Sequence, residues 1–167
     1  MKKALALSIL VLLLAVPSAG GPRLDALLDT VVAHRTSLQG LATHNPRSEK
    51  ARVAGLALVD QAILQFGDAD AARALATLGK GIAQLEKAAK IEVGGSFASG
   101  ARQAAQQIFA AAIAMFVPDI DKASSPEDVL AKRLRAPLSL AAQQRYGKAV
   151  GKLAKAWPAL LVLEPNP

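Results

Sequence analysis

The apolar residues of this chain recur at intervals of three and four, and this spacing restricts what the chain can fold into. One side of a predicted helix over 75–85 is lined by Leu75, Leu78, Ile82 and Leu85. Comparable stripes occur over 24–38 and 53–66, and such stripes are typical of amphipathic helices. No segment alternates apolar and polar residues as a half-buried strand does. The sequence therefore predicts an all-helical (all-α) fold.

Capping residues and glycines mark the ends of the first helices. Gly40 is placed to stop the first helix. Asn45 is placed to cap a second helix, with Pro46 in its first turn. Asp68 is placed to cap a third, which is expected to end near Lys90. The first half of the chain therefore predicts three consecutive helices.

Prolines divide the second half. An Ala-rich helix ends before Pro118, and its uniformly apolar residues 108–117 predict that it is the most buried helix. A short helix is expected over 126–135, and Pro137 is expected to open a final helix that ends at Trp157. Because the connections are short, we predict an up-and-down antiparallel bundle of four long helices plus a short extra helix.

Residues 1–20 predict a signal peptide. They begin with a methionine and two lysines, continue with 13 uncharged apolar residues and end in small side chains. A bilayer-spanning helix needs about 20 apolar residues, so a run of 13 favours a cleaved signal peptide over a permanent anchor, which remains the alternative. The small side chains of Ser18 and Gly20 place the expected cleavage after Gly20. Residues 21–167 then form a single domain, exported to the periplasm or the outside of the cell.

Residues able to support chemistry are sparse. The chain has no cysteine, which removes disulfides, thiolate nucleophiles and cysteine-ligated zinc. His34 and His44 are ten residues apart, unlike the three- or four-residue spacing of metal ligands on a helix. Asp119 and Asp121 begin like a calcium loop, but three later positions lack the required residues. We therefore expect no enzymatic activity, no cofactor and no bound metal.

Charge is distributed unevenly along the chain. Residues 21–130 contain 11 Lys and Arg against 12 Asp and Glu, whereas residues 131–167 contain seven Lys and Arg against Glu164 alone. The positive excess of the mature chain therefore comes from its C-terminal quarter. Nucleic acid is not the expected partner, because export separates the chain from it and no aromatic residues interleave the basic ones.

The stretch YGKAVGKLAKAW, over 146–157, separates basic from apolar side chains. At about 100° per residue, one side of the expected helix presents Arg145, Lys148, Lys152 and Lys155. The opposite side presents Tyr146, Val150, Leu153 and Trp157. The apolar side is narrow and flanked by small residues, which suits packing against another helix more than insertion into a bilayer. We therefore expect a packed helix with an outward basic stripe.

Several functions are compatible with that stripe. The preferred prediction is a non-enzymatic protein that contacts an anionic envelope surface or a partner protein through the four basic residues, including peripheral membrane contact. Alternatives are a stripe that is merely solvated, and self-association through the apolar tail 159–163. A further alternative is a carrier holding an apolar small molecule in a cavity beside Phe109, Met115 and Phe116.

One weak internal similarity is present. LGKGIAQLEKA, from Leu78, aligns without gaps with YGKAVGKLAKA, from Tyr146. The residues before each segment do not align. We interpret the similarity as chance resemblance between two Ala- and Lys-rich amphipathic helices rather than as a duplicated hairpin.

Overall fold

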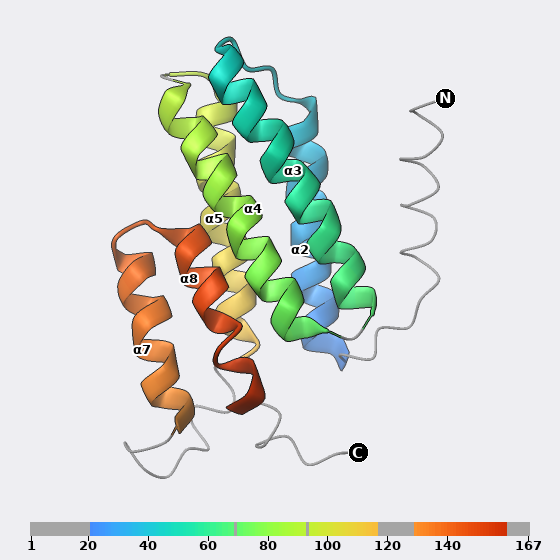
Figure 1. Cartoon of the computed structure of the whole chain (residues 1–167), viewed down its shortest axis with the longest axis vertical. Helices are drawn as coiled ribbons and strands as arrows, with labels where there is room; N and C mark the ends of the chain where they lie inside the picture. Colours follow the sequence, from blue (N-terminus) through green and yellow to red (C-terminus); the bar gives the residue numbers. More distant parts are fainter. Residues whose placement is uncertain (1–20, 69, 93, 117–128, 160–167) are drawn as a thin grey trace.

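The computed structural model describes residues 21–68, 70–92, 94–116 and 129–159, and every regular element within them is a helix (Figure 1). This confirms the all-helical prediction. The labelled helices are α2 (Gly21–Gly40), α3 (Pro46–Gly67), α4 (Ala71–Ile91), α5 (Ser96–Ala114), α7 (Val129–Ala142) and α8 (Tyr146–Leu153). The predicted signal peptide 1–20, the acidic loop with Asp119 and Asp121, and residues 160–163 of the apolar tail lie outside the described residues.

The ends of α3 and α4 show which capping predictions were right. The Asn45 side chain accepts a hydrogen bond from the Arg47 N–H at 2.8 Å, as predicted, with Pro46 in the first turn. Asp68 does not cap α4. Its N–H closes the last turn of α3, and Asp70 accepts the bond from the α4 backbone, at the Arg73 N–H. Because α3 continues through Gly67, the cap of α4 moves two residues along the chain.

Pro137 lies inside α7, so the prediction that it opens the final helix was wrong. A proline within a helix costs about 3 kcal/mol, because it removes one backbone hydrogen bond and crowds the preceding turn. In α7 the proline is itself buried, in line with Leu130 and Leu134. Burying each of those leucines contributes about 2 kcal/mol. Their combined burial therefore outweighs the local penalty.

The chain turns between α7 and α8 at Gln144, which has a φ of 55°. The N–H groups of Gln144 and Arg145 donate to the carbonyls of Ala141 and Leu140, at 2.8 and 3.0 Å. These two bonds form a Schellman motif, which satisfies the last carbonyls of α7. The final helix therefore begins at Tyr146 instead of Pro137.

Helix α4 is the most enclosed helix in the described structure. It packs against α3, α5 and α8 (Figure 1), and Leu75 and Leu78 are completely buried. The prediction that residues 108–117 form the most buried helix was wrong, because Ala110 and Ala114 of α5 are exposed. Helix α5 buries one side only.

Glycines bring α4 into backbone contact with α8. A Cβ atom on Gly79 would lie 2.4 Å from the backbone nitrogen of Gly151, and one on Gly147 would lie 2.4 Å from that of Ala83. These distances are far below van der Waals contact, so no side chain fits at either glycine. Gly79 of α4 meets Gly151 of α8, and the later residue Ala83 of α4 meets the earlier residue Gly147 of α8. The two helices therefore run antiparallel.

The contact between α4 and α8 also involves matching positions of the two similar segments, which begin at Leu78 and Tyr146. In the ungapped alignment Gly79 matches Gly147, and Ala83 matches Gly151. Each helix therefore places its first small residue against the second small residue of the other. The α4–α8 crossing is approximately two-fold symmetric, with the axis between the helices.

We predict that Gly79→Ala and Gly147→Ala each destabilise the fold by about 2 kcal/mol or more, because the added methyl group meets backbone atoms that cannot rotate away. Gly67→Ala is the matched control, since a Cβ there meets nothing within 4 Å. Urea unfolding followed by circular dichroism measures all three. Equal unfolding midpoints for Gly79→Ala and Gly67→Ala would contradict the close crossing.

Candidate basic surface

The four predicted basic residues are all exposed, but they do not lie on one continuous helix. Arg145 is the N-cap of α8, and Lys148 and Lys152 lie within it. The helix ends at Leu153, so Lys155 lies in the following turn, where its N–H donates to the Lys152 carbonyl at 3.1 Å. The predicted helix through 157 was therefore too long, while the exposure of the basic side chains agrees with the predicted outward stripe.

The apolar side of this segment faces the bundle, as predicted. Val150 and Leu153 are completely buried. The half-buried Tyr146 ring lies 6.0 Å from that of Phe109, and the half-buried Trp157 ring meets Phe116 edge-on at 6.3 Å. Detaching α8 would expose Val150, Leu153 and their counterparts on α4 and α5, with a loss of about 2 kcal/mol for each large side chain.

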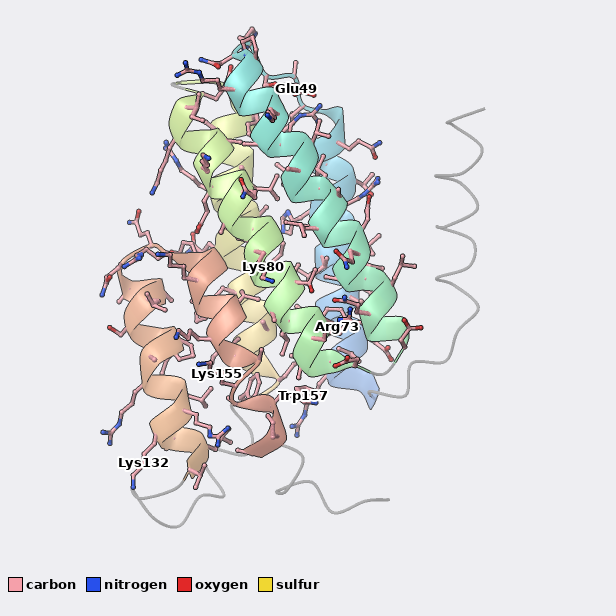
Figure 2. The ribbon with its side chains drawn as sticks, viewed as in Figure 1. Glu49, Arg73, Lys80, Lys132, Lys155 and Trp157 are labelled. Atoms are coloured by element: carbon pink, nitrogen blue, oxygen red, sulfur yellow. The ribbon has the colours of Figure 1, made fainter. Side chains whose placement is uncertain are left out.

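Helix α7 adds further cations beside α8. Lys132, Arg133 and Arg135 are exposed, and Figure 2 shows Lys132 near the end of α7 that is distant from the α7–α8 turn. The Arg133 guanidinium donates to the Lys155 carbonyl, which joins α7 to the turn after α8. Residues 129–159 contain seven Lys and Arg and no Asp or Glu. This part of the chain therefore carries charge of one sign.

Glu86 of α4 is the acidic residue that meets α8. Its carboxylate accepts a hydrogen bond from the Gly147 N–H at 3.3 Å, and so lies at the positive end of the α8 dipole. Burial raises the pKa of Glu86, while hydrogen bonds from the Gly147 and Tyr146 backbone oppose that rise. The charges of Lys90 and Arg145, both exposed, also oppose that rise, so Glu86 is engaged at the start of α8 with cations beside it.

A second polar cluster joins the end of α4 to the start of α3. The Glu92 side chain, 6% exposed, accepts hydrogen bonds from the backbone N–H groups of His44 and Asn45, at 2.7 and 3.2 Å. The His44 imidazole, 84% exposed, lies 2.9 Å from the same carboxylate. The His44 backbone hydrogen bond is the main reason why the pKa of Glu92 is lowered. Sequence reasoning missed this link because the partners are 48 residues apart.

This cluster is structural in character. Within 21–68, 70–92, 94–116 and 129–159, no group of three or more His, Asp or Glu side chains gathers as metal ligands would. The Glu92 carboxylate satisfies N–H groups that precede α3, which have no partner inside that helix. It also fixes the hairpin formed by α3 and α4.

We predict that Glu92→Gln lowers stability above pH 4.5 and that the difference from wild type shrinks at lower pH. A carboxyl group whose folded pKa is lowered contributes stability above its unfolded pKa, about 4.5, and loses it as pH falls through the folded value. Urea midpoints of both proteins at pH 7, 5 and 3 give the comparison. A difference that is constant across these pH values would contradict the role given to Glu92.

Side chains also occupy the region proposed for a carrier cavity. Phe109 and Phe116 contact the rings of Tyr146 and Trp157, and Met115 is buried. An apolar molecule beside these residues would compete with aromatic contacts already formed.

Among the described helices, none has both the length and the apolar character that crossing a bilayer requires. Compared with protein-family models, curated proteins and solved structures, the chain matches none of them. A function for this chain therefore has to be inferred from its own residues.

Proposed function

We propose that the protein is an exported, non-enzymatic helical bundle that acts by contact with an anionic envelope surface or a partner protein. The proposed contact residues are Arg145, Lys148, Lys152 and Lys155. One observation supports this most directly: these side chains are exposed while the apolar side of the same segment is buried. The basic residues can therefore meet an anionic surface without any loss of core packing.

The strength of such contact follows from charge. Each Lys or Arg near an anionic membrane surface contributes about 1 kcal/mol, and four such groups would give a total of about 4 kcal/mol. Salt screens these interactions over about 10 Å at 0.1 M. Binding is therefore expected to be reversible and to weaken steeply as salt is added.

We further propose that residues 1–20 are a signal peptide and that residues 21–167 form one domain, arranged as an up-and-down bundle. Hydrogen bonds between α2 and α3 support antiparallel neighbours: Arg35 pairs with Asp60, and Arg52 reaches the carbonyl of Leu38. The α3–α4 and α4–α8 glycine contacts support the same arrangement. Export would bring the basic residues to an envelope surface.

The carrier alternative has less support, because Phe109 and Phe116 already contact the rings of Tyr146 and Trp157 where its ligand would sit. Extraction of the purified protein followed by mass spectrometry separates the two functions. A lipid-like compound retained in stoichiometric amount would favour the carrier.

We predict that replacing Arg145, Lys148, Lys152 and Lys155 with Gln weakens binding to phosphatidylglycerol vesicles at low salt by at least a hundredfold, since four charges are lost. Cosedimentation measures the binding. For a charge-matched comparison, the triple Lys148, Lys152 and Lys155→Gln variant is set against a triple that neutralises exposed cations on other helices: Arg47, Lys50 and Arg102. Equal weakening by both triples would show that net charge alone matters and would refute the proposed contact.

A further inference from the structure

The two-fold contact between α4 and α8 has a consequence for charge on α4. Gly79 and Ala83 face α8, whereas Gly81 faces α3, where its Cβ would lie 3.0 Å from the Gly55 carbonyl oxygen. Lys80 and Lys87 are exposed. They are seven residues apart, or two helical turns, so they lie on the same side of α4.

The ungapped alignment of the segments from Leu78 and Tyr146 matches these two lysines with lysines of the second segment. Lys80 matches Lys148, and Lys87 matches Lys155. A two-fold axis that passes between two antiparallel helices keeps matched residues on the same face of the pair. Figure 2 agrees, since Lys80 and Lys155 are both drawn on the face turned toward the reader. The α4 lysines therefore share one face with the α8 lysines and with Lys155 in the turn after α8.

The glycine contact also places the two rows of lysines close together. Packed helices are usually 8–10 Å apart, and backbone contact at Gly79 and Gly147 brings α4 and α8 to the short end of that range. Across α4 and residues 129–159 the sequence has one acidic residue, Glu86, which is engaged at the start of α8. We name the resulting surface the two-helix basic face, comprising Lys80, Lys87, Lys148, Lys152 and Lys155.

We infer that the two-helix basic face, rather than α8 alone, is the binding surface, and that it binds an anionic lipid surface. The inference rests on the proposed function and extends it to Lys80 and Lys87. The five named cations are lysines, and lysine acts as a hydrated point charge without the planar fork that makes arginine selective. Two exposed arginines adjoin them: Arg145, the N-cap of α8, and Arg73, seven residues before Lys80 on α4. Protein interfaces rely on Trp, Tyr and Arg anchors in their centres, whereas the aromatic rings near α8 pack toward α5. A surface of many headgroups fits this pattern best.

The test measures binding of the full mature chain to phosphatidylglycerol vesicles in low salt. Lys80→Gln with Lys87→Gln removes the two α4 lysines of this face, and Lys50→Gln with Arg102→Gln removes two exposed cations on α3 and α5. Each surface charge is worth about fivefold in affinity. We expect the α4 pair to weaken binding at least tenfold and the control pair less than twofold. Circular dichroism checks that each variant folds.

Comparison with the α8 lysine variant separates the two proposals. Should Lys148, Lys152 and Lys155→Gln weaken binding while the α4 pair matches the control, the extension to α4 is refuted and the proposed function stands. Should none of these variants differ from the control, the proposed function fails as well.

Soluble polyglutamate distinguishes a lipid surface from an acidic protein partner. Tighter binding to vesicles than to polyglutamate of equal charge concentration supports the lipid assignment. Equal or tighter binding to polyglutamate overturns it.

Discussion

The contact between the backbones of α4 and α8 is the interaction on which the rest of this structure depends. Gly79 and Gly147 leave no room for a side chain, so the two helices meet at their main chains. The same crossing holds Val150 and Leu153 in the core and sets Glu86 at the start of α8. Helix α7 packs on α8, and so depends on the same crossing for its position.

The crossing also explains how an Ala-rich chain with few aromatic residues produces a defined charged surface. A short helix of eight residues would not be stable alone in water. Packed against α4, it holds its lysines at fixed positions beside those of its neighbour. The proposed contact relies on charge density, so it would need no cavity, metal or catalytic group. Glycines that pack the interior thereby determine the arrangement of cations outside.

The helices were predictable because three- and four-residue spacing reflects burial on one side of a helix. This held for the stripes of α2 and α4 and for that of α3 from Leu56 onward, whereas Val53 is exposed. Local rules failed where tertiary packing competed with them. Pro137 stays within α7 because Leu130 and Leu134 are buried beside it. The exposure of Lys148 and Lys152 followed from helical geometry, but the contribution of Lys80 required knowing which helix adjoins α8. The sequence did align Lys80 with Lys148, but only the antiparallel crossing shows that this alignment puts the two lysines on the same face.

If α8 stays packed while its lysines meet an anionic surface, the surroundings of Trp157 do not change on binding. Trp157 is the only tryptophan, and its ring contacts Phe116 just beyond α8. Fluorescence is measured while the protein is bound to phosphatidylglycerol vesicles whose acyl chains carry bromine, which quenches tryptophan in the hydrocarbon region. The account predicts full binding with an unchanged emission maximum and no quenching. A blue shift with strong quenching would show that the segment leaves the bundle and inserts, which would contradict the account.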